Sequence, residues 1–276
     1  MSPNNRPLVI CVGAQKAGTS WLYKCLEEHR DICAADGKET NFFLYPRNKE
    51  LQKYLDLFKH CRDKSHYFEA SPLYLYDKSV AHSIFEYSPS TKIIVILRNP
   101  VERTISHYHH LQNNETIDDS IRLETAIERW PELIKYSQYK KHIKIYTEQF
   151  PPSNILFIDF EDIKKRPQYV MDTVCRFCGV NTFTPRFLRK KYNSSAARSN
   201  RFYGTMTMVY LKLKGNFFGK KLLYILRCLN VRSDSLENLL SKTSRKKSYI
   251  HESEVQLIRD SLVDELEFYK SLEYGN

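Results

Sequence analysis

The sequence predicts an α/β fold: a P-loop-like three-layer sandwich in which helices flank a central parallel sheet. Three observations predict it. Short apolar runs alternate with helix-length segments along the chain. The strongest run, 92–97, is continuous and rich in β-branched residues, which is typical of a strand covered on both faces. A glycine-bearing loop, 13–20, joins the first apolar run to the first helical segment.

The elements follow one another in strand and helix order. The predicted strands are 8–12, 67–69, 92–97 and 154–158. The predicted helices are 19–28, 50–58, 77–86, 101–112, 120–129, 131–149, 161–177 and 252–272. No repeat or low-complexity linker separates them. We therefore expect one domain over 1–276, with its core over about 8–180 and a part made of helices and basic loops over about 181–276.

The chain is basic: its 43 Lys and Arg against 32 Asp and Glu give 276 residues a net charge of +11. Such a surface attracts nucleotides, acidic glycans, acidic lipid or nucleic acid. No aromatic-interleaved nucleic-acid motif is present, so nucleic acid is not an expected partner. No run approaches the ~20 apolar residues of a membrane span, and the apolar stretch 217–229 is interrupted by basic residues, as in an amphipathic helix. We expect no integral membrane segment.

The seven cysteines indicate free thiols rather than a disulfide framework, because their number is odd and Cys11 falls in a buried strand. Cys175 and Cys178 form a CxxC pair in a helical segment, without a second pair or a nearby histidine, and this favours a buried helix face over zinc or redox chemistry. No signal peptide opens the sequence. A cytoplasmic location is expected, or the Golgi lumen for a chain trimmed of a membrane anchor.

The 13–20 loop nearly matches the phosphate-loop pattern G-x-x-x-x-G-K-[ST]. Gly13 and Gly18 keep their spacing, but Thr19 takes the lysine position and the lysine is Lys16. Backbone N–H groups, the positive end of the following helix and the hydroxyls of Thr19 and Ser20 still form a cradle for an anion.

One interpretation of this cradle is a kinase or NTPase that uses Mg-ATP. It would take Ser20 as the metal-bound hydroxyl and the strand-end Asp159 as the acid. The missing lysine argues against it, because Thr19 cannot neutralise transferring phosphates. A non-catalytic module that binds polyanions is a further alternative, resting on the net charge alone.

A second pattern lies where the strongest strand ends. Arg98 follows the 92–97 run, Pro100 starts a helix, and Ser106 lies on that helix. Ligands of open α/β sheets bind at the carboxyl ends of the strands. Arg98 and Ser106 are therefore placed to hold a second phosphate.

With these two motifs the chain resembles the sulfotransferases that use 3′-phosphoadenosine 5′-phosphosulfate (PAPS), in particular the heparan-sulfate-type and bacterial carbohydrate branch. In that family G-x-x-K-x-G-T-[ST] binds the 5′-phosphosulfate, and L-R-[DN]-P-x-x-R followed by a serine binds the 3′-phosphate. The resemblance is good over about 8–180 and loose beyond. It implies in-line transfer of a sulfuryl group from PAPS to a hydroxyl of a carbohydrate or glycolipid, with no metal.

The resemblance also implies roles for single residues. The expected donor contacts are Lys16, Ala17, Gly18, Thr19, Ser20 and Trp21 on the 5′ side, Arg98 and Ser106 at the 3′-phosphate, and Arg245 and Lys247 in a covering segment. Lys38-Glu39-Thr40-Asn41-Phe42-Phe43 resembles the family segment K-E-x-x-F-F. It implies Glu39 as the general base, with Lys16 stabilising the donor oxygen and Lys38 flanking the acceptor.

Some features depart from the family pattern or leave alternatives open. Residues 69–74 match E-K-[ST]-x-x-Y except that Ala70 replaces the lysine, which weakens the expectation of a heparan-like polymer. Other branches use a histidine base, and the histidines available here are His107, His109 and His110. Tyr136 and Tyr139 either line an acceptor cleft or belong to the core. The sequence does not name the acceptor, the sulfated position or the oligomeric state.

Overall fold

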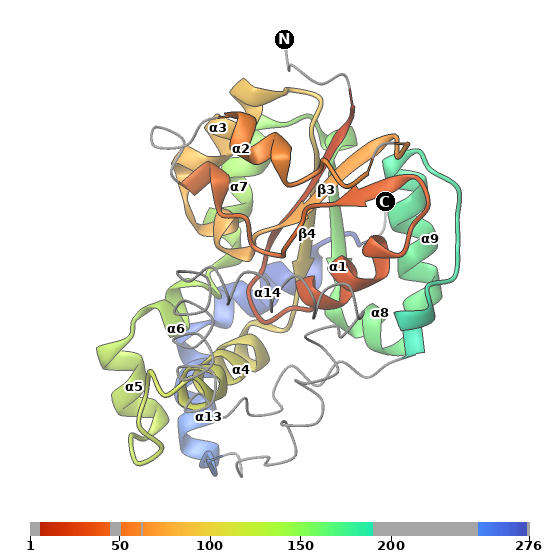
Figure 1. The fold of residues 1–276 in the computed structure, drawn as a ribbon. Helices are drawn as coiled ribbons and strands as arrows, with labels where there is room; N and C mark the ends of the chain where they lie inside the picture. The colour runs from red at the N-terminus through yellow and green to blue at the C-terminus, as the bar shows by residue number, and fades with distance from the viewer. Residues whose placement is uncertain (1–5, 45–50, 62, 190–247, 275–276) are drawn as a thin grey trace, which may run out of the picture.

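A parallel five-stranded sheet forms the centre of the molecule, in the order β2-β3-β1-β4-β5 (Figure 1). The computed structural model describes residues 6–44, 51–61, 63–189 and 248–274. The strands are β1 (Leu8–Gly13), β2 (Ile32–Ala34), β3 (His66–Ala70), β4 (Lys92–Leu97) and β5 (Ile155–Asp159). The predicted α/β class is confirmed, and the short edge strand β2 is an element that the sequence pattern did not reveal.

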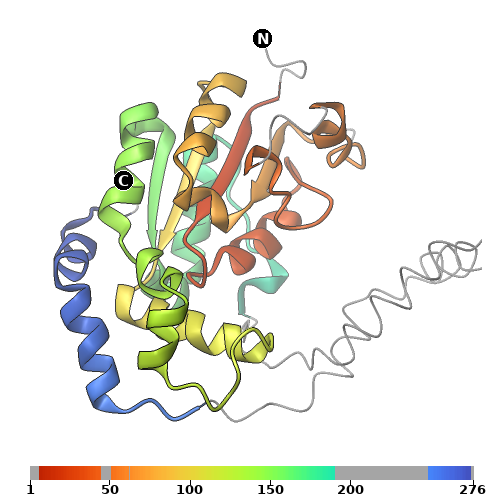
Figure 2. The same ribbon diagram turned by 90° about the vertical axis from the view of Figure 1, so that its left-hand side faces the viewer.

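Helices cover both faces of the sheet. On one side lie α1, α8 and α9, and on the other lie α3 and α7 (Figure 1, Figure 2). The helices are α1 (Thr19–Glu27), α2 (Leu51–Asp56), α3 (Lys78–Tyr87), α4 (Pro100–Asn113), α5 (Leu123–Arg129), α6 (Glu132–Lys135), α7 (Tyr139–Gln149), α8 (Phe160–Lys165), α9 (Pro167–Cys178), α13 (Glu252–Ser261) and α14 (Val263–Ser271).

The strand register places four loops at one edge of the sheet. Cys11 pairs with Ala70 near the ends of β1 and β3, and Leu97 pairs with Asp159 at the ends of β4 and β5. Because all strands are parallel, the segments that follow β1, β3, β4 and β5 leave the sheet side by side. This is the edge where open α/β sheets bind ligands.

A second hydrophobic cluster joins α4, α5, α6 and α13 near this edge. The buried Arg103 of α4 fixes α4 to α6 and to the residues that follow it: its Nη2 donates to the carbonyl of Leu133 in α6, and its Nε donates to Ser137 Oγ at 2.5 Å. Ser137 in turn donates to the carbonyl of Pro100 at 2.9 Å. A buried guanidinium is tolerated because its donors have partners, so α4 starts at a fixed position.

Three of the predicted helices are each divided in two. The segment predicted over 131–149 breaks between α6 and α7 at Gln138, whose backbone is non-helical with φ −81° and ψ 69°. The segment predicted over 161–177 breaks between α8 and α9 at Pro167, which cannot donate a helical hydrogen bond. The segment predicted over 252–272 breaks at Leu262, which adopts a non-helical conformation.

The expectation that the cysteines are all free is wrong. Cys33 on β2 and Cys61 after α2 form a disulfide with Cα atoms 5.8 Å apart, although they are separated by 28 positions in sequence. Spacing alone gave no sign that these two segments are neighbours. The bridge also removes the free-thiol reason for expecting a reducing compartment. Four other cysteines are free and buried, as expected: Cys11, Cys25, Cys175 and Cys178.

Some sequence expectations fall on residues outside the described ranges, namely Arg245, Lys247, Cys228 and the apolar stretch 217–229. Within the described part of the chain, every helix is too short or too polar to cross a bilayer.

Candidate active site

The 13–20 loop between β1 and α1 requires glycine at positions 13 and 18. Gly13 has φ +157°, and a Cβ there would lie 2.8 Å from the Cβ of Leu75 and 3.2 Å from the carbonyl of Pro72. Gly18 has φ +101°, and a Cβ there would lie 3.1 Å from the ring of Phe160. The left-handed backbone and the close neighbours exclude larger residues at both positions.

Lys16 lies at the turn of this loop, itself in the left-handed region with φ 70°. The backbone N–H of Gln15 donates to Tyr76 Oη at 3.0 Å and so anchors the loop to the segment after β3. Burial of the Lys16 ammonium, together with the charges of Arg98 and Lys38, lowers its pKa to about 8. These cations therefore lie close to one another, at a point where an anion would relieve their repulsion.

The N-terminus of α1 faces the same loop. Gly18 is its N-cap, no side chain caps this end of α1, and its first turn contains no acidic residue. Thr19 is buried and Ser20 is half-buried, while Trp21 and Ala17 belong to the hydrophobic core. An uncapped helix N-terminus beside a half-buried lysine is suited to a phosphate or sulfate group.

Arg98 stands at the end of β4, as predicted. Its guanidinium lies over the Phe160 ring, 4.8 Å from the centroid, and pairs with Glu102 at 2.9 Å. The side chain of Asn99 caps α4 by accepting from the N–H groups of Val101 and Glu102. Ser106 lies half-buried further along α4. The ring and the carboxylate hold Arg98 in place at the edge where the loops meet.

The 38–44 loop carries the Lys38–Glu39 ion pair. Glu39 has φ 65°, in the left-handed region, and its N–H donates to the carbonyl of Ala70 at 3.1 Å. The charges of Lys38 and Glu39 both act on Lys16. The structure thus brings together the predicted residues Lys16, Lys38, Glu39 and Arg98.

Glu69 at the end of β3 is the site residue that sequence reasoning missed. It is fully buried, and hydroxyl donors surround it: Tyr54 and Ser71, each at 3.0 Å, with Thr40 and Tyr74. Burial raises the pKa of this carboxyl, against the lowering effect of those hydrogen bonds. Four hydroxyl residues, Thr40, Tyr54, Ser71 and Tyr74, stand at different distances from Glu69 along the sequence. The sequence does not show that their side chains meet at this carboxylate.

The network joins the two motifs 38–43 and 69–74. Besides Thr40, which donates to Glu69, the N–H of Asn41 donates to Ser71 Oγ at 3.3 Å, and the N–H of Phe43 donates to Tyr74 Oη at 3.1 Å. The end of β3 thereby holds the loop that carries Glu39.

Histidine and tyrosine residues nearby have structural surroundings. His107 stacks beside Tyr136, and burial next to Arg103 lowers its pKa to about 2, so it is a poor base. Tyr76 also stacks on Tyr136, with 3.9 Å between the ring centroids. Tyr139 is buried and donates to the carbonyl of Arg98 at 2.8 Å. Tyr139 therefore belongs to the hydrophobic core, whereas Tyr136 is half-buried and stacks with Tyr76 and His107.

The remaining two histidines of this helix are also engaged locally. His109 is buried with Nδ1 3.4 Å from Gln112 Oε1, and His110 has Nε2 3.1 Å from the amide of Asn114. Both contacts lie within one turn of α4, and neither brings a carboxylate to the ring.

Asp159, the acid that a kinase would need, is engaged elsewhere. Its carboxylate caps α8 by accepting from the N–H of Glu161 at 2.9 Å, and it accepts from Tyr269 Oη at 2.5 Å. A metal ion would have to compete with both donors. The structure therefore gives Asp159 a role in joining α8 to α14.

The fold and these cationic positions define a phosphate-loop α/β protein. The family model for the sulfotransferase domain matches residues 6–207. That is well over half of the chain, which therefore belongs to the sulfotransferase family.

Individual proteins are similar over much of the chain. Heparan sulfate glucosamine 3-O-sulfotransferase 3B1 of Homo sapiens is 29% identical over 181 residues, 63% of this chain and 46% of that protein. Bifunctional heparan sulfate N-deacetylase/N-sulfotransferase 1 of Xenopus tropicalis is 27% identical over 197 residues, 63% of this chain and 22% of that protein. The chain thus spans less than half the length of these two relatives. A sulfotransferase structure from Alicyclobacillus acidocaldarius has 27% identity and a TM-score of 0.62, over 73% of this chain and 93% of that one.

Replacing Glu69 by Ala is expected to lower the free energy of unfolding by about 2–4 kcal/mol, because it leaves buried hydroxyl groups without their acceptor. Urea unfolding measures this. Glu69→Gln is the matched control: it keeps an acceptor oxygen and the side-chain size, and should cost less.

A comparison of wild type with Glu69→Gln also tests the raised pKa of Glu69. The folded state holds this proton to a higher pH than the unfolded chain, so the residue makes stability fall as pH rises above the ordinary carboxyl value of 4.5. Glu69→Gln lacks this fall. A stability difference between wild type and Glu69→Gln that is constant from pH 4 to pH 8 would contradict the prediction.

Proposed function

We propose that this protein transfers the sulfuryl group of PAPS to a hydroxyl of a carbohydrate or glycolipid, and that one domain over 1–276 carries the activity. The observation that carries the proposal is the grouping of Lys16, Arg98, Lys38 and Glu39 at one edge of the sheet, in a chain of the sulfotransferase family. The heparan sulfate names of the relatives support a carbohydrate acceptor.

The residues present fit PAPS. The uncapped α1 terminus offers N–H groups to the 5′-phosphosulfate, from the N-cap Gly18 and from Thr19 and Ser20 in the first turn, and the half-buried Lys16 offers a positive charge. In this proposal Arg98 and Ser106 hold the 3′-phosphate. When bound, PAPS supplies the sulfuryl group and a phosphate leaving group. Fixed cations and amides take up the charge, so we assign no residue to a metal.

The acceptor side consists of Lys38 and Glu39. In the proposal, Glu39 accepts the proton of the attacking hydroxyl as the oxygen approaches sulfur opposite the leaving phosphate. Lys16 stabilises the charge that develops on the bridging oxygen. In the structure the Lys38 ammonium pairs with the Glu39 carboxylate. In the proposal, the acceptor hydroxyl displaces this ammonium from the carboxylate, and Lys38 then contacts the acceptor.

The proposal includes a covering segment with Arg245 and Lys247 on the donor. Ser248, the residue after Lys247, donates to Gln112 Oε1 at 3.1 Å on α4, the helix that also carries Ser106. This contact brings the chain back to α4 directly after the basic run. It supports Lys247 and Arg245 as further donor contacts.

The first test is calorimetric titration with 3′-phosphoadenosine 5′-phosphate (PAP), the nucleotide product, in EDTA. Wild type is expected to bind, and Arg98→Ala to bind about 10–100-fold more weakly, because a charge-assisted contact to phosphate is lost. Arg166→Ala is the matched control: Arg166 also pairs with a carboxylate, Asp162, and lies over a ring, Tyr169. Binding of Mg-ATP without binding of PAP would overturn the proposal in favour of a kinase.

The affinity for PAP is expected to fall above pH 8. The free protein has lost the Lys16 proton above its pKa of about 8, so binding a phosphate must take that proton up again, at a cost of up to tenfold in affinity per pH unit. Lys16→Arg, which stays charged, should remove this dependence. Titrations between pH 7 and pH 10 measure it, and an equal fall in both proteins would assign it to another group.

Glu39→Gln is expected to lower sulfuryl transfer at least 100-fold while the PAP affinity stays unchanged, because a base is lost and the donor contacts remain. Transfer of labelled sulfate to a panel of glycans measures the rate. Glu148→Gln, which also removes a lysine-paired carboxylate, is the control and should keep full activity. Full transfer by Glu39→Gln would exclude Glu39 as the base.

A further inference from the structure

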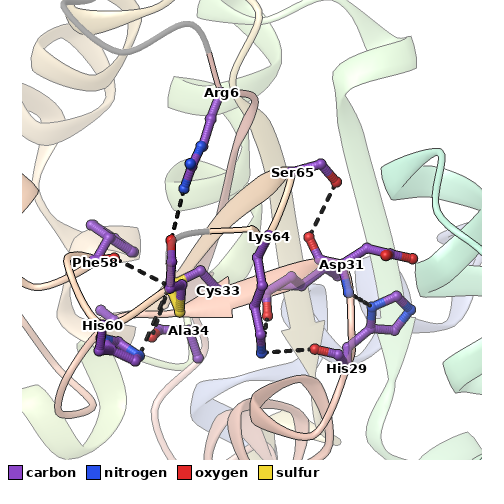
Figure 3. The surroundings of a disulfide bond; sticks show 12 residues. Arg6, His29, Asp31, Cys33, Ala34, Phe58, His60, Lys64 and Ser65 are labelled. Carbon is purple, nitrogen blue, oxygen red and sulfur yellow. Dashed lines mark hydrogen bonds between the residues drawn. A yellow bond between two sulfur atoms is a disulfide. The ribbon is translucent and has the colours of Figure 1, made fainter.

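The disulfide between Cys33 and Cys61 has a histidine beside it. His60 Nε2 lies 3.9 Å from Cys33 Sγ, and the ligand atoms of Cys33, His60 and Cys61 all lie within 4.8 Å of one another (Figure 3). The two cysteines are buried, whereas His60 is exposed. Within the ranges that the structure describes, this is the one group of three His, Cys, Asp or Glu ligands so close together.

Two thiolates and an imidazole are a ligand set that Zn²⁺ prefers. Tetrahedral zinc with Zn–S near 2.3 Å and Zn–N near 2.0–2.1 Å places sulfur and nitrogen ligand atoms about 3.5–3.8 Å apart. The separation of Cys33 Sγ from His60 Nε2 is already close to that value. The two sulfurs have to move apart, which they do when their bond is broken, and Cys61 Sγ lies within 4.8 Å of the imidazole ligand atom before that movement.

We propose that Cys33, His60 and Cys61 bind Zn²⁺ when the disulfide is reduced, with water as the fourth ligand. A dithiol reductant supplies two electrons: the S–S bond breaks, each sulfur gains a proton, and the reductant becomes a disulfide. Zn²⁺ then displaces the two thiol protons and binds the thiolates. Zinc and the disulfide are therefore alternative states of one site, because both use the same sulfurs.

The backbone around the ligands is held by contacts that do not involve sulfur. Arg6 Nη1 donates to the carbonyl of Cys61 at 2.9 Å. Lys64 Nζ donates to the carbonyls of His29 at 2.8 Å and Ile32 at 3.0 Å, next to Cys33 (Figure 3). Both sides of the site thus keep their positions after reduction. A site that is already in place loses less entropy when the metal binds.

The surroundings have room for a fourth ligand. A cavity of 310 Å³ adjoins the cluster and is lined by His60, Cys61 and Lys64 together with the carboxylates of Asp36 and Glu27. It is large enough for water and polar enough to hold it. Two thiolates balance the charge of Zn²⁺, so the bound state adds no net charge to this partly buried region.

The test uses the full chain, reduced with a phosphine under anaerobic conditions and titrated with Co²⁺ as a spectroscopic substitute for zinc. We expect one Co²⁺ per chain, with thiolate-to-cobalt charge transfer and the visible bands of tetrahedral cobalt, and displacement by Zn²⁺. The oxidised protein should show none of these. An equal spectrum from oxidised protein, or binding without thiolate bands, would overturn the proposal.

Variants assign the ligands. His60→Ala, at an exposed position, should weaken Co²⁺ binding at least tenfold, whereas His82→Ala, at an exposed position on α3, should not change it. His60→Cys should restore binding with stronger thiolate bands. Cys175→Ala/Cys178→Ala removes the CxxC pair of α9 and should keep the spectrum. Loss of the spectrum in this last, folded variant, or its persistence in Cys33→Ser/Cys61→Ser, would assign the metal elsewhere.

Discussion

The buried carboxylate of Glu69 is the constraint on which the geometry of the site depends. It is an acceptor without a charged partner, and hydroxyl groups from three separate segments satisfy it. Unpaired buried carboxylates are costly, so the chain must bring those hydroxyls to the end of β3. In doing so it fixes the 38–44 loop against β3 and keeps Glu39 near Lys16, in a backbone conformation that is unfavourable for a non-glycine residue.

The cationic part of the site consists of Lys16, Lys38 and Arg98, whose like charges repel one another. Lys16 is half-buried and lies near Arg98 and Lys38, and its lowered pKa records the unfavourable energy of that arrangement. Arg98 is restrained by Glu102 and Phe160, and the start of α4 by Arg103. The fold thus maintains a positive site that a doubly phosphorylated ligand would neutralise. The energy stored without a ligand becomes binding energy for an anion.

Much of the fold could be predicted because burial on both faces gives β1, β4 and β5 continuous apolar runs. The three-residue strand β2 could not, since it is too short for a periodic signal. The helix breaks at Gln138 and Leu262 depended on backbone conformations that no local pattern marks, whereas the break at Pro167 had a local signal in the proline itself. Local motifs gave the positions of Lys16 and Arg98 at strand ends. The role of Glu69 and the pairing of Cys33 with Cys61 required knowledge of which distant segments meet, which no local pattern in one sequence contains.

The strand order has a consequence for how the protein is made. β1 precedes its two neighbours in the sheet along the chain: β3 ends at Ala70 and β4 at Leu97. A parallel strand cannot form a hairpin with the next one, so β1 must wait for both partners. The 13–20 loop therefore acquires its shape only after the chain has been synthesised through the end of β4 at Leu97. Until then the apolar strand that precedes it is exposed to other chains and to chaperones.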